Sequence, residues 1–319
     1  MFLFFVACGV APKQKAVEIL EKGINDESII VRVHAAKALR QIGEDRGLDL
    51  LYQINRSGDQ EGCAAALRAL YDLDEGTYSP ELWSYALEGD PSIRIEAYKL
   101  IASMKDERCR DMLIKGTDDK IAKIRRISYL GLEKFKEDDV LRGGLRDIDP
   151  LVRIAAAKAL GRTGEQDLKD FIRNELNGTE NDVWCHGIIA LAEMGDTSVI
   201  HDIGGRLYSA PWEVRLAAVE ALLIMNNHDG VLVLQEALQS DDPFAREYAV
   251  NILKKYKISE TTQLLKDLVH DEYTNVSVAA IEALVQYGAK EQQRLFEEMM
   301  NVPNPLVQIA AAAAYLQGE

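Results

Sequence analysis

The pattern of apolar and polar positions repeats along the chain from Pro12 onward. When the sequence is aligned on Arg153, a key position recurs every 31 residues, except for one step of 28 residues between Arg125 and Arg153. A fixed period of this length is typical of architectures in which each structural repeat contacts its neighbours. The ten key positions are Arg32, Cys63, Arg94, Arg125, Arg153, Trp184, Arg215, Arg246, Ser277 and Gln308.

Three rows of side chains keep their character in every repeat. Twelve residues before the key position stands a large apolar residue: Leu20, Leu51, Leu82, Leu113, Leu141, Ile172, Ile203, Leu234, Leu265 and Phe296. Three residues after it stands a small one: Ala35, Ala66, Ala97, Ser128, Ala156, Gly187, Ala218, Ala249, Ala280 and Ala311. Seven residues after it stands Leu39, Leu70, Ile101, Leu132, Leu160, Leu191, Leu222, Leu253, Leu284 or Tyr315. Each repeat therefore predicts a first helix with a large apolar row and a second helix with a small face.

The segment Asp147 to Gly164 is the most regular copy of the second half of a repeat. Asp147 and Asp149 are suited to cap a helix, and Pro150 suits its first turn. Because neither helix of a repeat can bury its apolar stripe alone, the repeats must stack side by side. The predicted fold is all-α, an α-solenoid (superhelix) of about ten two-helix repeats over residues 13–319.

Two irregularities modify this prediction. The repeat before Arg153 is three residues short and carries Gly143 and Gly144 in its first helix, which predicts a bend near residues 136–147. The last helix, Leu306 to Leu316, is almost entirely apolar and has no polar outer face. Since a solenoid end needs cover, we expect self-association or partner docking through the C-terminal repeat.

Composition narrows the classes of function. The 319 residues are 47% hydrophobic and 28% charged, with a formal net charge of −15 and no continuous apolar run long enough for a membrane span. The acidic balance disfavours nucleic acid as a partner, since phosphate binding depends on Lys and Arg. The four cysteines, at positions 8, 63, 109 and 185, show no CxxC spacing.

The N-terminal segment, residues 1–12, differs from the repeats. Phe2 to Ala7 is an apolar run before Cys8, and it resembles the end of a bacterial lipoprotein signal, although no Lys or Arg precedes Cys8. The resemblance implies lipidation of Cys8, with the protein anchored in the bacterial cell envelope and facing the periplasm. The alternative is an apolar N-terminal tail on a cytoplasmic protein.

The turn and second helix carry a family resemblance. The pattern D-x-D-P-x-V-R-x-x-A-x-x-A-L-G is similar to HEAT repeats, specifically the short repeats of the phycobilin-lyase-like HEAT family. The resemblance covers about 300 residues and implies the solenoid fold. That family includes bilin lyases, a metal-dependent hydroxylase, scaffolds and assembly factors. In HEAT folds, turn Asp and second-helix Arg residues often form a ladder, which here would join Asp26, Asp90, Asp149 and Asp242 to Arg32, Arg94, Arg153 and Arg246.

The sequence gives little support for a catalytic function. The hydroxylases of this superfamily bind iron through paired His-Glu motifs, and the sequence contains no His-Glu dipeptide. We therefore predict no metal site, no cofactor and no catalytic residue. Cys63, Cys109 and Cys185 are predicted to be small buried hydrophobes, because no histidine stands at helical spacing from them.

Binding is the remaining class, and the exposed side of the second helices is the first candidate surface. We expect the residues one and five positions after the key position to face outward, on what is usually the concave side. The first row gives an apolar floor that includes Val33, Ile95, Ile154 and Leu216, and the second row begins basic with Lys37, Arg68, Lys99 and Lys158. This predicts a groove for an extended protein segment. The alternative is that neighbouring repeats cover the apolar row.

A second candidate surface lies at the turns of repeats six to nine. It is formed by aromatic residues within a few positions of a helix-to-helix turn, namely Trp184, Tyr208, Trp212, Phe244 and Tyr273. Aromatic residues along one edge favour recognition of a protein or a planar ligand. The alternative is that each ring fills the apolar seam beneath its own turn.

These observations favour a non-catalytic scaffold or assembly factor that binds protein, with membrane contact only through a lipid anchor. The main alternative is a bilin-lyase-like HEAT protein that acts on a tetrapyrrole-carrying client. A DNA-binding HEAT protein, similar to alkylpurine glycosylases, is a third reading that the acidic composition disfavours.

Overall fold

The computed structural model describes residues 11–76, 79–161, 166–177, 180–208 and 211–319. Within these ranges every regular element is helical, as the sequence predicted: twenty α-helices joined by turns and short 3-10 segments. Cys8 lies outside the described residues, so its lipidation stays a prediction.

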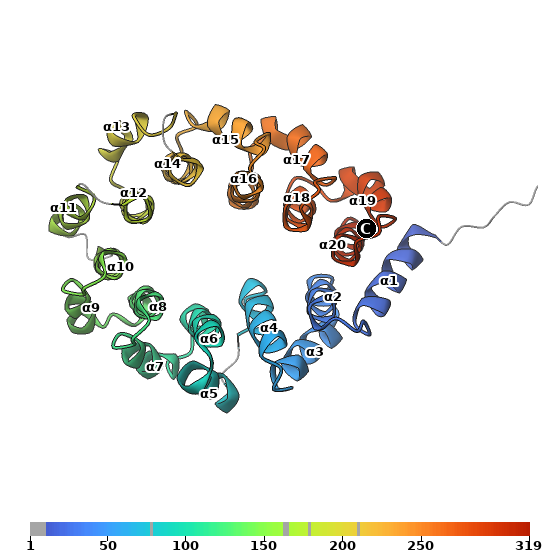
Figure 1. Cartoon of the computed structure of the whole chain (residues 1–319), viewed down its shortest axis with the longest axis horizontal. Coiled ribbons are helices and arrows are strands. Elements are labelled where there is room, and N and C mark those ends of the chain that lie inside the picture. Colours follow the sequence, from blue (N-terminus) through green and yellow to red (C-terminus); the bar gives the residue numbers. More distant parts are fainter. Residues whose placement is uncertain (1–10, 77–78, 162–165, 178–179, 209–210) are drawn as a thin grey trace, which may run out of the picture. The chain divides into compact units, whose positions relative to one another are not determined.

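Ten consecutive pairs of helices correspond to the ten predicted repeats (Figure 1). In chain order they are α1 Pro12–Gly23, α2 Ile29–Gln41, α3 Asp45–Asn55, α4 Gln60–Asp72, α5 Pro80–Glu88, α6 Pro91–Ser103, α7 Cys109–Gly116, α8 Ala122–Leu132, α9 Asp138–Gly144, α10 Pro150–Leu160, α11 Gln166–Glu175, α12 Asn181–Glu193, α13 Val199–Gly204, α14 Trp212–Ile224, α15 Val231–Leu238, α16 Pro243–Lys255, α17 Thr262–Leu268, α18 Thr274–Gln286, α19 Gln293–Met299 and α20 Pro305–Gln317.

The chain divides into two compact units. Unit 1 combines Met1–Ile54 with Leu253–Glu319, and unit 2 comprises Asn55–Ile252. In unit 2 the even-numbered helices from α4 to α14 pack on one another in chain order, with the odd-numbered helices on their other side (Figure 1). The small residues that stand three positions after the key position permit this close packing. Among them, Ala97, Ala156 and Ala218 are fully buried. The face of this layer that points away from the odd-numbered helices is called here the second-helix face.

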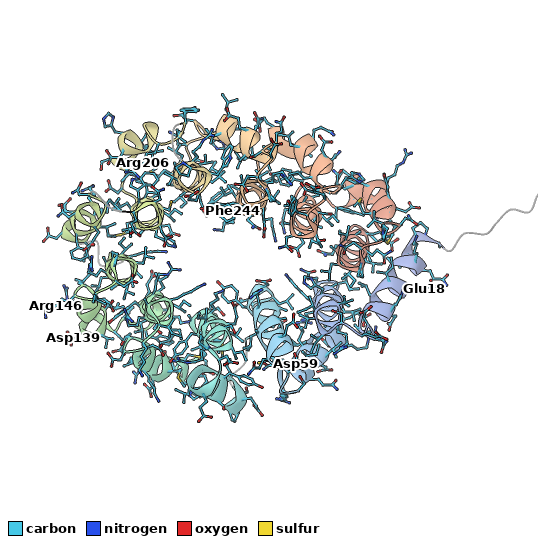
Figure 2. All side chains as sticks on the ribbon, viewed as in Figure 1. Glu18, Asp59, Asp139, Arg146, Arg206 and Phe244 are labelled. Atoms are coloured by element: carbon cyan, nitrogen blue, oxygen red, sulfur yellow. The ribbon has the colours of Figure 1, made fainter. Side chains whose placement is uncertain are left out.

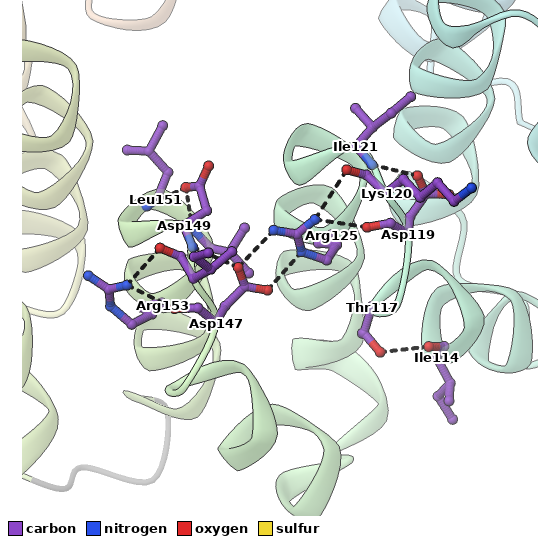
Figure 3. A network of polar contacts seen from close by, with 12 residues as sticks. Ile114, Thr117, Asp119, Lys120, Ile121, Arg125, Asp147, Asp149, Leu151 and Arg153 are labelled. Carbon is purple, nitrogen blue, oxygen red and sulfur yellow. Dashed lines mark hydrogen bonds and ion pairs between the residues drawn. The ribbon is translucent and has the colours of Figure 1, made fainter.

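In the described part of the chain, the side chain at the key position donates a hydrogen bond to a backbone carbonyl before its helix in eight of the ten repeats, all except those of Cys63 and Trp184. Arg125 donates to the carbonyl of Asp119, and Arg153 donates to the carbonyl of Asp147, each at 2.8 Å (Figure 3). The same bond to the carbonyl six residues back is made by Arg32, Arg246 and Gln308. Arg94, Arg215 and Ser277 instead donate to the carbonyl eight residues back. Most key-position side chains thus satisfy a backbone carbonyl that the helices themselves leave unpaired.

The arginine ladder between repeats is present, but its acids are not those predicted. Arg125 pairs with Asp147 at 2.7 Å and Arg153 pairs with Glu175 at 2.5 Å. Arg94 pairs with Asp119 and Arg215 with Glu236 in the same way. Asp149, which the prediction paired with Arg153, instead accepts hydrogen bonds from the first backbone N–H groups of α10 (Figure 3). Capping and ion pairing therefore use different carboxylates of the same turn.

Of the two glycines before Arg153, Gly143 and Gly144, packing explains only Gly144. A Cβ added at Gly144 would lie 2.6 Å from the Cβ of Ala156 and 2.7 Å from the ring of Tyr129, whereas one at Gly143 would meet nothing within 4 Å. Gly144 therefore lets the seven-residue helix α9 approach α8 and α10. Across this short repeat α8 and α10 remain in extensive contact. The bend near residues 136–147 stays a prediction.

In unit 1 the last helix packs against the first repeat of the same chain. α20 lies beside α1 and α2 (Figure 1), and its Val307, Ile309 and Ala311 are buried. A Cβ at Gly23 of α1 would lie 2.8 Å from the Cβ of Ala35 in α2 and 3.1 Å from Cδ1 of Ile309, so this glycine lets α1 approach both α2 and α20. The prediction that the C-terminal repeat offers an uncovered surface for self-association is therefore wrong. Its apolar face is covered by α1 and α2, so the two ends of the chain cap each other.

An ion cluster strengthens this junction in unit 1. Glu282 of α18 contacts Lys254 at 2.5 Å and Lys37 of α2 at 3.7 Å, and its side chain is 26% exposed. Burial raises the pKa of Glu282, but Lys37 and Lys254 outweigh burial, so its pKa lies below the ordinary value of 4.5. Lys37, predicted to line a groove, thus belongs to a structural contact between residues distant in sequence.

The position of the key arginine predicts an order of stability among variants. Arg153→Gln keeps a donor for the turn carbonyl, as Gln308 does, but loses the ion pair with Glu175, and should cost about 1 kcal/mol. Arg153→Met loses both and should cost about 2 to 3 kcal/mol. Urea denaturation followed by circular dichroism measures both, with the exposed Lys115→Gln as control. Equal losses for Gln and Met would show that the carbonyl bond contributes nothing.

The Glu282 cluster predicts a pH dependence. Because the folded-state pKa is depressed, the stabilisation by Glu282 is complete above the unfolded value of 4.5 and is lost as pH falls through the lower folded value. Glu282→Gln should cost about 1 kcal/mol at neutral pH. The difference between wild type and variant should shrink in denaturation experiments carried out at progressively lower pH. A difference that is the same at pH 7 and at low pH would contradict the assignment.

Candidate functional site

The second-helix face of unit 2 carries a groove formed by five successive second helices. Its central pocket has a volume of about 460 Å³ and is lined by Tyr71, Lys99, Arg126, Ile127, Leu130, Leu151, Ile154, Ala155, Lys158, His186, Ile189, Ala190 and Glu193. These residues lie in the second helices α4, α6, α8, α10 and α12. The groove therefore runs across repeats two to six.

Two smaller pockets extend the groove. One, of about 360 Å³, shares Arg126, Leu151 and His186 with the central pocket and adds Lys123 and Asp182. The other, of about 250 Å³, shares Tyr71, Lys99 and Leu130 and is lined in addition by Ala102 and Ser103. The shared residues make the three pockets one continuous depression, which is called here the repeat-groove.

The helical face that lines the repeat-groove follows a regular register. Counted from the key position, most of the lining residues stand at −2, +2, +5 and +9, a spacing that places them on one side of an α-helix, and Arg126, Ile154, Ala190 and Tyr71 stand beside these rows at +1, +1, +6 and +8. The +5 row contributes Lys99, Leu130, Lys158 and Ile189, as predicted. The −2 row, which sequence reasoning missed, contributes Lys123 and Leu151. Half-buried apolar side chains at these positions form the floor.

The apolar row one residue after the key position is largely covered. Val33, Ile154 and Leu216 are 3%, 3% and 0% exposed, so the prediction that they form an exposed floor is wrong. Position +1 is rotated by about 100° from position +2, toward the neighbouring second helix. Ile154 still contributes to the edge of the repeat-groove, and Ile95 is half-buried.

Charged residues surround the floor of the repeat-groove. Glu96 accepts from Arg68 at 3.4 Å and from Lys99 at 3.0 Å, and its side chain is almost buried. Lys158 pairs with Glu193. The predicted basic residues Lys99 and Lys158 therefore line the repeat-groove, each held by a carboxylate, whereas Arg68 pairs with Glu96 and lines none of the three pockets.

The aromatic residues near the turns do not form one patch. Trp184 is 4% exposed, and the guanidinium of Arg206 stacks on its ring at 4.5 Å, so Trp184 fills the seam beneath its turn. Trp212 is half-buried under Arg215, at 4.1 Å. Tyr208 and Phe244 are 61% and 56% exposed. Figure 2 labels Arg206, beyond α13, and Phe244, in the first turn of α16. The prediction of an exposed binding residue is wrong for Trp184.

The described residues show no grouping of His, Cys, Asp or Glu suited to a metal ion. Cys63, Cys109 and Cys185 are buried, which confirms the prediction for these three thiols. Burial raises the pKa of Cys63 and of Cys109 to about 11 and that of Cys185 to about 12. In the part of the chain that the structure describes, no helix is both long and apolar enough to cross a bilayer.

The raised thiol pKa values predict low reactivity. At pH 8 a thiol with a pKa of about 11 is a thiolate in a fraction on the order of 0.001. In a Cys8→Ser background, the folded protein should react with a thiol reagent far more slowly than free cysteine does. All three thiols should react after denaturation in urea. A thiol in the folded protein that reacts as fast as free cysteine would contradict the burial described above.

Comparisons with known proteins identify the repeat. The family model described as HEAT repeats matches residues 139–223 and 231–316, more than half of the chain. The model described as PBS lyase HEAT-like repeat matches residues 31–54. Among curated proteins, none matches the sequence significantly.

Several solved structures are similar to this chain at low identity and with TM-scores below 0.5. The complex of CpcE and CpcF of phycocyanin lyase from Nostoc sp. PCC7120 is 14% identical, with 99% of this chain and 98% of that chain covered and a TM-score of 0.37. Human deoxyhypusine hydroxylase is 15% identical over 74% of this chain and 94% of that chain, with a TM-score of 0.34. Kap121p bound to RanGTP is 15% identical over 95% of this chain and 40% of that chain, with a TM-score of 0.40.

Proposed function

Because the chain belongs to the HEAT-repeat proteins, we propose that it is a non-catalytic scaffold or assembly factor that binds a protein partner along the repeat-groove. Repeat solenoids present long surfaces built from equivalent positions of successive repeats, and these surfaces suit extended protein segments. The buried thiols and the lack of a metal-type cluster among the described residues offer no competing chemistry.

The observation that carries the proposal is the apolar floor of the repeat-groove. Ile127, Leu130, Leu151 and Ile189 are half-buried and line one pocket of about 460 Å³. Side chains of this kind lose contact with water when a partner covers them, which is favourable by about 25 cal/mol per Å² of apolar surface. Charged residues at the edges then determine register and selectivity.

The proposal extends to location. The apolar run before Cys8 supports a lipid anchor in a bacterial cell envelope, with the solenoid facing the periplasm. An anchored scaffold would gather partners at the membrane surface. Mass spectrometry of the protein from its native cell tests this, since an acylated Cys8 supports the anchor and an unmodified N-terminal segment favours the cytoplasmic alternative.

A bilin-lyase-like role is the second candidate, and the match of residues 31–54 to the PBS lyase HEAT-like repeat favours it. In that reading the protein acts on a tetrapyrrole-carrying client. Mixing the purified protein with a free bilin and recording the absorbance spectrum separates the two functions. A shifted bilin band that saturates at one bilin per chain would support the lyase-like role.

The scaffold proposal predicts that one floor residue controls partner capture. Ile189→Glu places a charge in the half-buried floor, and it should abolish recovery of the partner from the native cell. The matched control is Leu232→Glu, which introduces the same charge at a side chain that is 65% exposed on α15. The control should recover the partner as the wild type does.

Thermal denaturation first establishes that both variants are folded. If folded Ile189→Glu recovers the same partners as wild type in the same amounts, the repeat-groove is not the binding surface. If wild type and both variants recover no protein in common, the scaffold function itself is contradicted.

A further inference from the structure

We propose that the repeat-groove binds an acidic, amphipathic segment of the partner protein, with one carboxylate of that segment held between Lys123 and Arg126. The inference rests on the proposed function and specifies the chemistry of the partner. It is drawn from the charged side chains of the groove, from which of them already have an ion-pair or hydrogen-bond partner, and from the apolar floor between them.

The carboxylates of the repeat-groove are already engaged. Glu96 is bound by Arg68 and Lys99, and Glu193 is bound by Lys158. Asp149 caps α10 through two backbone N–H groups. A carboxylate oxygen of Asp182 lies 3.2 Å from the ring of His186. Glu193 of the groove and Glu96 beside it therefore have cationic partners, Asp149 has backbone donors, and Asp182 contacts an imidazole nitrogen of His186.

Two cations of the repeat-groove lack such a partner. Among the described residues, neither Lys123 nor Arg126 makes an ion pair or a side-chain hydrogen bond, although both line the 360 Å³ pocket. Burial lowers the pKa of Lys123, and the charges of Lys99, Arg126 and Arg68 lower it further, while the charge of Glu96 opposes them in part. The positive charges of three successive repeats thus repel one another at this point, and an added carboxylate would relieve the repulsion.

The apolar floor beside these cations determines which other side chains the partner segment needs and how long the segment is. Ile127 and Leu130 follow Arg126 on α8, and Leu151 lies between the two pockets that share it. A segment that covers the floor must present apolar side chains on the same side as its carboxylate. Five second helices spaced by about 9 Å span about 36 Å, which an extended segment of roughly ten residues covers.

The same arrangement argues against a nucleic acid strand. A phosphodiester backbone carries a negative charge at every nucleotide and would meet Glu193, Asp149 and Asp182 along the groove. A protein segment can place a carboxylate at Lys123 and Arg126 and neutral side chains elsewhere. The formal net charge of −15 adds long-range repulsion against a polyanion, whereas a short segment with a few carboxylates is affected less.

The test uses the full chain and synthetic peptides of about ten residues, a length set by the span of the groove. The probe is a fluorescein-labelled peptide with Leu at the first, third, seventh and ninth positions, Glu at the fifth and Ser at the even positions, so that in an extended conformation the Glu lies on the same side as the Leu side chains. Its matched controls carry Lys or Ser in place of Glu. Fluorescence anisotropy should show the tightest binding for the Glu peptide. Binding should weaken as NaCl is raised, because part of the attraction is screened at a Debye length of about 8 Å in physiological salt.

Charge reversal identifies the subsite. The double variant Lys123→Glu with Arg126→Glu should weaken binding of the Glu peptide by about tenfold or more, and it should restore binding of the Lys peptide. The matched control is Lys105→Glu with Lys115→Glu, which changes the net charge equally at exposed residues outside the three pockets. This control should bind the Glu peptide within about twofold of wild type.

Several outcomes would overturn the inference. The inference is overturned if the Glu peptide shows no saturable binding, or if the Glu and Lys peptides bind with equal affinity. It is also overturned if the two double variants lose equal affinity for the Glu peptide, or if a single-stranded oligodeoxythymidine of similar length binds more tightly. The scaffold proposal is judged separately by Ile189→Glu. If capture of the native partner depends on Ile189 but not on Lys123 and Arg126, the groove remains the binding surface and only the acidic partner is ruled out.

Discussion

The hydrogen bond from the key-position side chain to a turn carbonyl is the constraint on which the stacked repeats depend. A turn between two antiparallel helices leaves carbonyl groups without helical partners, and burying them unpaired would be costly. Arg125, Arg153 and Gln308 meet this need from the second helix, so helix and turn keep a fixed geometry. The ion pair that an arginine adds to the next repeat is a secondary contribution, because Gln308 and Ser277 do without it.

The fold could be predicted because its determinants are local and repeated. The apolar row from Leu20 to Phe296 and the small row from Ala35 to Ala311 recur in ten repeats, and the period alone defines the helix pairs. The exposed face was harder to assign. Positions +1 and +2 differ by about 100° on a helix, and the crossing of adjacent second helices decides which of them is covered. Ile154 is almost fully buried, while Ile127 and Lys158 are half-buried on the groove, and one helix considered alone does not reveal this difference.

The choice of carboxylate for each arginine and the covering of the apolar face of α20 depend on contacts between residues distant in sequence. The sequence identifies Asp147 and Asp149 as candidates for both a cap and an ion pair, but the position of α8 assigns Asp147 to Arg125. The contact between α20 and the first repeat joins segments nearly 300 residues apart in numbering, and no local pattern encodes it. Trp184 is similar, because its place under Arg206 depends on the following repeat.

The contact of α20 with α1 and α2 also orders events during synthesis. The surface that α1 and α2 present to α20 cannot be covered until the ribosome has made the last helix, roughly 250 residues later. At about 5 to 20 residues per second this leaves apolar side chains of the first repeat unprotected for roughly 15 to 50 s. Unit 2 is contiguous and can fold during that interval, whereas unit 1 must wait. Chaperone dependence should therefore concentrate on the earliest-made helices of the nascent chain.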